Sequence, residues 1–209
     1  YEILRCLVGS EMCIRDRVYG EAMGVLSGVS LLNYAYETML KTFEMTSDAD
    51  RVIRALKIMS EKTGIHGMLG GQSVDVENDG KEISREMLDY IYEHKTSALI
   101  EASMMAGAVL GGADEEQTAL IEKAASAIGM AFQIQDDILD VTSTSQELGK
   151  PVHSDEKNHK VTYVTLFGVE KASEQVLQFS EQAQSILENL SNKNKFLTAL
   201  IMEMASRRK

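Results

Sequence analysis

The sequence predicts an all-α protein, and three observations support this prediction. Proline, which breaks helices, occurs once in 209 residues, and tryptophan does not occur. Methionine, a good helix former that packs adaptably, occurs 12 times. No segment shows the apolar and polar alternation that a half-buried strand requires. Hydrophobic residues make up 44% of the chain, which is enough for one domain with a substantial core.

Apolar periodicity and helix-ending signals predict the elements in chain order. Residues 18–45 are expected to form the first helix, which the polar residues 46–48 end. A second helix is expected to begin near Asp50, where apolar residues recur at helical spacing. The glycine-rich stretch 64–71 and the turn-like residues 78–80 follow it.

Capping signals define the next two helices. Ser84 is the expected N-cap of a long helix, which Gly111 and Gly112 end. Asp114 and Gln117 have the spacing of a capping box for the following helix, which contains the motif FQIQDDILD at residues 132–140. Residues 142–160 form the most polar internal stretch and are interpreted as a long loop, and two further helices are expected after it.

Charge and composition exclude several classes of function. The net charge of −11 and the pI near 4.9 leave no basic field for a nucleic acid. No apolar run approaches the ~20 residues that a membrane span needs, so stable membrane insertion is not expected. Cys6 and Cys13 are too few for a disulfide scaffold, and we therefore expect a cytoplasmic protein.

Residues 1–17 differ in pattern from the rest of the chain. They show weak periodicity and contain both cysteines, and the string YEILRCLVGSEMCIRDR resembles a translated sequencing-adapter remnant. A native first helix or strand is the alternative. We expect the native fold to occupy residues 18–209.

The motif FQIQDDILD concentrates acidic side chains on an otherwise apolar helix. On a helical wheel, at about 100° per residue, one arc holds the polar side chains and apolar residues fill most of the remaining circumference. A helix that is apolar nearly all round belongs in the interior, so the acids should face an internal cavity. The residues of the polar arc are Gln133, Asp136, Asp137 and Asp140.

Carboxylates grouped in a cavity require counter-charge. Hard divalent cations supply it, and magnesium commonly shares its ligation with substrate phosphates. A solvated acidic face is the alternative interpretation. Lys95 interrupts an apolar stripe next to the hydroxyl of Thr96, and Lys150, Lys157 and Lys160 lie in or just after the polar loop. Each lysine alone fits a surface position, but together with the acids they indicate a metal-bridged polyanion such as diphosphate.

These residues resemble the trans-prenyl diphosphate synthases, the farnesyl and geranylgeranyl diphosphate synthase family. FQIQDDILD is similar to the second aspartate-rich motif of that family, and other pieces agree in order and spacing across residues 18–209. They are Tyr19-Gly20-Glu21-Ala22-Met23, Gly70-Gly71-Gln72 with Asp75, His94-Lys95-Thr96, Gly149-Lys150-Pro151, Ser154-Asp155 and Lys160-Val161-Thr162-Tyr163.

The resemblance implies a fold, a reaction and partners. The fold would be the isoprenoid synthase helical bundle around a central cavity, with its N-terminal helices missing, so that residues 18–209 form the C-terminal part of one domain. The protein would be a homodimer that uses three Mg²⁺ ions to condense an allylic diphosphate with isopentenyl diphosphate. The expected product is farnesyl diphosphate, with geranylgeranyl diphosphate next.

The resemblance also assigns roles to residues. Asp136, Asp137 and Asp140 would bind the metal ions. The residues expected to act in catalysis by holding the allylic diphosphate or the water shell of the metal are Lys95, Thr96, Gln133, Lys150 and Lys160. Gln72 and Phe132 would join them in binding substrate.

The sequence departs from the family pattern before residue 18, where the first aspartate-rich motif is expected and is not found. We therefore expect this chain by itself to be inactive. Smaller departures are Val29-Ser30 and Val164. The alternatives are a catalytically silent subunit of a heteromeric synthase, a terpene cyclase of the same fold, and a helical scaffold without a site. The lysine elements disfavour the cyclase, and the intact acidic motif disfavours the silent subunit.

Overall fold

A computed structural model describes residues 18–143, 160–190 and 194–207. All regular secondary structure in these ranges is helical, as the composition predicts. The chain divides into two compact units, one ending at Val52 and the other beginning at Ile53. Within the described residues, no helix combines the length and the apolar composition needed to cross a membrane.

The first unit contains helix α3 (Glu21–Leu40), which continues as a short 3₁₀ turn, η1 (Lys41–Glu44). The predicted helix over 18–45 is thus confirmed over most of its length, although its last turn tightens. Among the described residues of α3 only Gly24 is buried, and the apolar side chains of Val25, Leu26 and Val29 are exposed.

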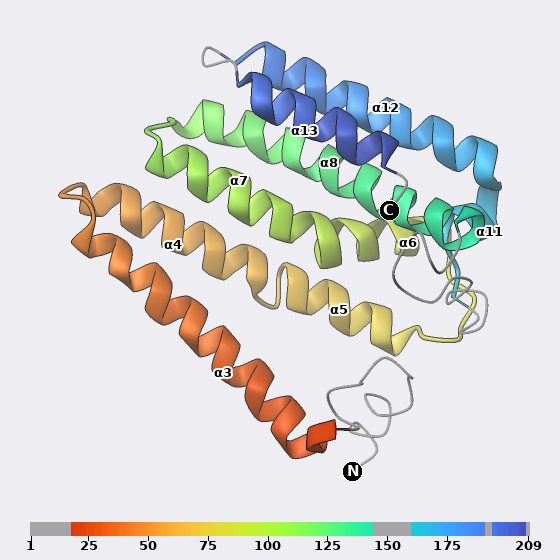
Figure 1. Ribbon diagram of the computed structural model, residues 1–209, viewed down its shortest axis with the longest axis horizontal. Helices are drawn as coiled ribbons and strands as arrows, with labels where there is room; N and C mark the ends of the chain where they lie inside the picture. The colour runs from red at the N-terminus through yellow and green to blue at the C-terminus, as the bar shows by residue number, and fades with distance from the viewer. Residues whose placement is uncertain (1–17, 144–159, 191–193, 208–209) are drawn as a thin grey trace. The chain divides into compact units, whose positions relative to one another are not determined.

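The second unit is built around helix α8 (Glu115–Thr142), which packs against α12, α7 and the turn η2 (Figure 1). Helix α13 lies along both α12 and α8, and α5 packs against η2. The other elements are α4 (Ala49–Thr63, continuous across the boundary between the units), α5 (Met68–Glu77), α6 (Arg85–Ile91), η2 (Tyr92–Ser97), α7 (Ala98–Leu110), α11 (Tyr163–Phe167), α12 (Val169–Glu188) and α13 (Lys195–Ser206).

The predicted caps are present. The Ser84 hydroxyl accepts a hydrogen bond from the Met87 N–H at 3.3 Å at the start of α6. At the start of α8 the Asp114 carboxylate accepts from the Gln117 N–H at 2.8 Å, and the Gln117 side chain accepts from the Asp114 N–H at 3.2 Å. This reciprocal pair is the predicted capping box.

Two features of the helices differ from expectation. The long helix predicted after Ser84 contains a π-helical turn, η2, between α6 and α7. The glycine-rich stretch predicted to separate helices instead contributes Gly70 and Gly71 to α5. Glycine lowers helix propensity by about 1 kcal/mol, but close packing against η2 favours it at position 71.

The core forms around α8, whose apolar residues are buried on nearly every side, which confirms the interior position predicted for this helix. One cluster joins α8 to α6, η2, α11 and α12 and includes Ile91, Ile134 and Tyr163. A second joins α8 to α12 and α13 and includes Ile128, Leu187 and Ile201. The polar arc of α8 therefore lies on a helix that the core holds rigidly.

Candidate functional site

The site is centred on η2, which close backbone packing holds between α5 and α8. A Cβ atom added to Gly71 would meet the backbone of His94 and Lys95 within 3 Å. A Cβ atom added to Gly129 of α8 would meet Ser97 within 3 Å in the same way. Larger residues at either position would displace the turn that carries Lys95 and Thr96.

Two lysines meet on one carboxylate of α5. Lys95 Nζ lies 2.5 Å from Asp75 Oδ2, and Lys160 Nζ lies 3.6 Å from the same oxygen. The lysine side chains are about one third exposed, whereas Asp75 is 18% exposed. Lys95 and Lys160 are 20 and 85 positions from Asp75 in the sequence. Their ammonium groups nevertheless meet at one partly exposed position, where they could bind a polyanion.

Thr96 connects η2 to the acidic motif. Its hydroxyl donates a hydrogen bond to Gln133 Oε1 at 2.9 Å, and both side chains are half-buried. Gln133 lies one turn before Asp136 and Asp137 on α8. This hydrogen bond therefore connects the turn that carries Lys95 to the helix that carries the three carboxylates.

The three carboxylates of the motif have different surroundings. Asp137 is 2% exposed and accepts hydrogen bonds from the Tyr92 hydroxyl at 2.6 Å and the Tyr163 N–H at 3.0 Å. Asp140 is 4% exposed, and the side chain of Asp136 is 34% exposed. The protein donors on Asp137 compensate its burial, so this residue anchors η2 and α11 to α8.

Asp136 faces a cation from another part of the chain. Arg207, the residue after α13, places Nη2 3.2 Å from Asp136 Oδ1. Its guanidinium also stacks on Phe132, with 4.0 Å between the guanidinium carbon and the ring centroid. The accessible carboxylate of the motif is therefore already paired with a positive charge.

Tyr163 supports the buried side of the motif. Its ring is fully buried beside Tyr92 and Phe167, and its hydroxyl donates to Asp89. Burial raises the pKa of the Tyr163 hydroxyl strongly, and the hydrogen bond to Asp89 adds to the increase. Tyr163 is therefore neutral over the physiological pH range and acts as a hydrogen-bond donor.

The carboxylates of the acidic motif suit magnesium only if a phosphate supplies further oxygen ligands. Across the ranges that the structure describes, no group of three or more His, Cys, Asp or Glu side chains is arranged to hold a metal ion. Magnesium needs no such cage, because one or two carboxylates with water and phosphate oxygens satisfy it. Asp136, whose side chain is 34% exposed, offers one such carboxylate, whereas the Tyr92 hydroxyl and the Tyr163 N–H donate to Asp137.

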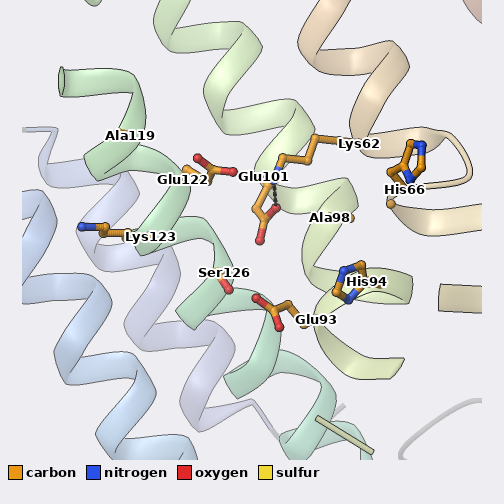
Figure 2. Close-up of a pocket in the computed structure, with 11 residues that line it drawn as sticks. Lys62, His66, Glu93, His94, Ala98, Glu101, Ala119, Glu122, Lys123 and Ser126 are labelled. Atoms are coloured by element: carbon orange, nitrogen blue, oxygen red, sulfur yellow. Dashed lines mark hydrogen bonds and ion pairs between the residues drawn. The ribbon is translucent and has the colours of Figure 1, made fainter. Parts of the chain in front are cut away.

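A cavity of about 320 Å³ opens on another face of η2 (Figure 2). It is lined by Glu93, His94 and Ala98, and not by Lys95 or Thr96. Figure 2 shows Lys62 reaching from α4 towards Glu101 on α7. Lys62 Nζ lies 2.5 Å from carboxylate oxygens of both Glu101 and Glu122, so one ammonium connects three helices.

The charge state of Lys62 follows from its surroundings. Burial of the ammonium acts to lower its pKa, but the hydrogen bonds and charges of Glu101 and Glu122 outweigh burial, and the pKa of Lys62 is raised above 10.5. The side chain of Glu101 is only 7% exposed and therefore depends on this partner. The network is a structural wall of the cavity.

The structure brings together most of the residues predicted from sequence. Lys95, Thr96, Gln133, Asp137 and Lys160 make the contacts described above. Gln72 and Phe132 are half-buried, and Phe132 contacts Arg207. Lys150 and most of the predicted loop lie outside the described residues.

Four residues were not predicted to belong to the site. Asp75 was part of a motif match, but nothing in the sequence paired it with Lys95. Tyr163 was part of another motif match, and Tyr92 carried no prediction, although the acidic motif indicated a need for compensating groups. Nothing in the sequence paired Arg207 with Asp136, because 71 residues separate them.

Comparison with known proteins agrees with this geometry. The family model described as "Polyprenyl synthetase" matches residues 10–203, which is most of the chain. The chain belongs to the polyprenyl synthetase family. This result confirms the resemblance found in the motifs, and the all-α isoprenoid synthase fold follows from it.

Members of the polyprenyl synthetase family with known names give the same assignment. Farnesyl diphosphate synthase of Geobacillus stearothermophilus is 38% identical over 173 residues, which are 83% of this chain and 58% of that protein. The chloroplastic geranylgeranyl pyrophosphate synthase of Catharanthus roseus is 40% identical over 172 residues, which are 82% of this chain and 48% of that protein. The chain therefore spans about half the length of these curated relatives.

The fold also matches a solved structure with ligands. The geranyltransferase of Helicobacter pylori complexed with magnesium and isoprenyl diphosphate superposes with a TM-score of 0.77 at 30% identity. The match covers 90% of this chain and 61% of that one.

Proposed function

We propose that this chain carries the half of a short-chain prenyl diphosphate synthase that holds the allylic diphosphate. The observation that carries the proposal is the meeting of Lys95 and Lys160 on Asp75, beside the Thr96–Gln133 hydrogen bond and the acidic motif. Two lysines, a hydroxyl and an accessible carboxylate are groups that suit a magnesium diphosphate.

The residues of the chain would act on the diphosphate by binding and charge neutralisation. Lys95 and Lys160 would exchange Asp75 for phosphate oxygens and stabilise the negative charge that develops as the allylic C–O bond breaks. Thr96 and Gln133 would orient the group, and Asp136 and Asp140 would hold magnesium. When bound, magnesium would supply Lewis-acid stabilisation of the leaving diphosphate.

The complete enzyme would join the allylic carbon to isopentenyl diphosphate, with farnesyl diphosphate as the preferred product. Three magnesium ions would be used, as the family resemblance implies. We propose that the site described above binds diphosphate without turning it over unless a first aspartate-rich motif completes it. A cytoplasmic location stays a prediction that rests on composition.

We also propose that the protein forms a homodimer. Helix α3 presents large apolar side chains that are about half exposed, and such surfaces usually mark a protein contact. They include Val25, Leu26, Val29 and Leu32. Light scattering on the purified chain should give twice the monomer mass, and a monomer at micromolar concentration would contradict the proposal.

Calorimetry with inorganic pyrophosphate tests the diphosphate site directly. In the presence of Mg²⁺ the wild-type chain should bind one pyrophosphate, and Lys95→Met should weaken binding roughly tenfold or more, the effect of a lost charge-assisted hydrogen bond. Lys57→Met is the matched control, because Lys57 is 73% exposed and pairs only loosely with Glu61. Absence of wild-type binding, or equal loss in both variants, would refute the site.

A further inference from the structure

The residue after α13, Arg207, contacts three residues of the acidic motif. Its Nη2 atom lies 3.2 Å from Asp136 Oδ1 and donates a weaker hydrogen bond to the Phe132 carbonyl at 3.4 Å. Its own carbonyl accepts from Gln135 Nε2 at 3.2 Å. With the stacking on Phe132, these contacts fix the plane, the position and the backbone of Arg207.

These contacts differ from those of an ordinary surface ion pair. The side chain of Arg207 is 20% exposed, whereas the exposed pair of Arg51 and Asp48 has side chains that are 46% and 42% exposed. The Nε atom of Arg207 is buried and has no hydrogen-bond acceptor among the described residues. Leaving a buried guanidinium donor unsatisfied is unfavourable, so stability alone does not explain this placement.

The partner of Arg207 is the acidic residue that the proposed function assigns to magnesium. A guanidinium and a hydrated divalent cation at the same carboxylate repel each other, and the guanidinium already occupies Oδ1 of Asp136. The guanidinium is thus a stand-in cation at a position where the donor chemistry fits magnesium.

We propose that Arg207 is a positioning residue that holds Asp136 and Phe132 in place without metal and gives up Asp136 when a divalent cation binds. The inference rests on the proposed function, because it assumes that Asp136 is a metal ligand. Arg207 would keep the carboxylate oriented and neutralised, and metal binding would have to displace the guanidinium. Arg207 therefore lowers the affinity of the site for the free ion.

Mn²⁺ binding measures this competition without any need for turnover. The free Mn²⁺ signal in electron paramagnetic resonance gives the dissociation constant for the full chain in the absence of pyrophosphate. We expect Arg207→Ala to tighten Mn²⁺ binding roughly tenfold, a change of about 1.4 kcal/mol. Arg207→Lys should give an intermediate value, because lysine keeps the charge but loses the planar stacking.

Arg51→Ala is the matched control, because it removes the same charge from an exposed pair elsewhere. It should leave the Mn²⁺ dissociation constant unchanged, which excludes an effect of net charge. A second measurement is urea unfolding. Without Mn²⁺ the Arg207→Ala chain should be less stable than wild type, and saturating Mn²⁺ should reduce that difference.

Each outcome decides the matter. Tighter binding by Arg207→Ala, or binding by this variant alone, supports the exchange. Equal or weaker binding beside a wild-type chain that binds Mn²⁺ overturns it and leaves the proposed function standing, since Arg207 would then be structural or would itself hold the ligand. Absence of saturable Mn²⁺ binding in both chains refutes the metal role of Asp136, and the exchange with it.

Discussion

Lys62→Met is expected to destabilise the protein because it leaves the buried carboxylate of Glu101 without a counter-charge. The ammonium of Lys62 lies 2.5 Å from both Glu101 and Glu122. Methionine keeps most of the side-chain volume but removes the charge, so Glu101, with a side chain that is 7% exposed, would lose its cation. The effect should therefore be electrostatic and not a packing defect.

The exposure of the three side chains sets the magnitude. Breaking a fully buried pair costs about 3–5 kcal/mol. Lys62 is 25% exposed and Glu122 is 40% exposed, so solvent screens part of the interaction and we expect a loss of about 2–3 kcal/mol. With a urea m-value of about 2 kcal/mol/M, the unfolding midpoint should fall by about 1–1.5 M with an unchanged slope.

Urea unfolding followed by circular dichroism provides the assay. The Lys57→Met control on the same helix removes an exposed lysine 3.9 Å from Glu61 and should cost less than about 0.5 kcal/mol. Adding Glu101→Gln to Lys62→Met should restore much of the loss, because the buried carboxylate is then neutral. A Lys62→Met chain as stable as the Lys57→Met chain, or no rescue by the second change, would refute the reasoning.

The pH dependence of the network has a definite sign. Because the folded pKa of Lys62 is raised above its ordinary 10.5, its contribution is complete below pH 10.5 and is lost as the pH rises through the folded value. The difference in stability between wild type and Lys62→Met should therefore be constant at neutral pH and shrink above pH 10.5.

Three further predictions address the site. Gly129→Ala should lower stability by about 1–2 kcal/mol in thermal unfolding, because its Cβ would meet the buried Ser97, whereas Gly107→Ala, with open space around its Cβ, should stabilise α7. Tyr163→Phe should leave the phenolate absorbance titration unchanged below pH 11, because the raised pKa keeps Tyr163 protonated; a smaller amplitude in the variant would contradict this. Asp75→Asn should tighten pyrophosphate binding about threefold in calorimetry without metal, because Lys95 loses an internal competitor, and weaker binding would contradict the proposed exchange.

Local patterns were sufficient to predict the central helix and its caps. The capping box of α8 and its burial on nearly all sides depend on residues within one helix, where periodicity and spacing carry the information. Helix α5 was missed because Gly70 and Gly71 read as helix breakers. The reason for Gly71 lies in the backbone of η2, which the sequence around position 71 does not contain.

The electrostatic partners could not be predicted in the same way. The acidic arc on α8 predicted that a positive charge must lie nearby. Which cation supplies that charge depends on packing between elements that are distant in sequence. Lys62 and Glu101 are 39 residues apart, and Arg207 and Asp136 are 71 apart. Sequence reasoning therefore singled out the carboxylates and the lysines, and it attributed the compensating charge to a metal and a diphosphate.

In the structure, residues of the chain itself supply counter-charges or hydrogen bonds for the lysines and for the carboxylates. Lys95 and Lys160 share Asp75, Arg207 faces Asp136, and protein donors satisfy Asp137. A magnesium diphosphate offers an anion for the lysines and a cation for Asp136 at the same time, and the two bound charges attract each other. Magnesium alone would bind Asp136 without the attraction of a bound anion, and pyrophosphate alone would bind the lysines without the attraction of a bound cation. The two ligands should therefore bind with positive coupling, each tightening the other by the same factor.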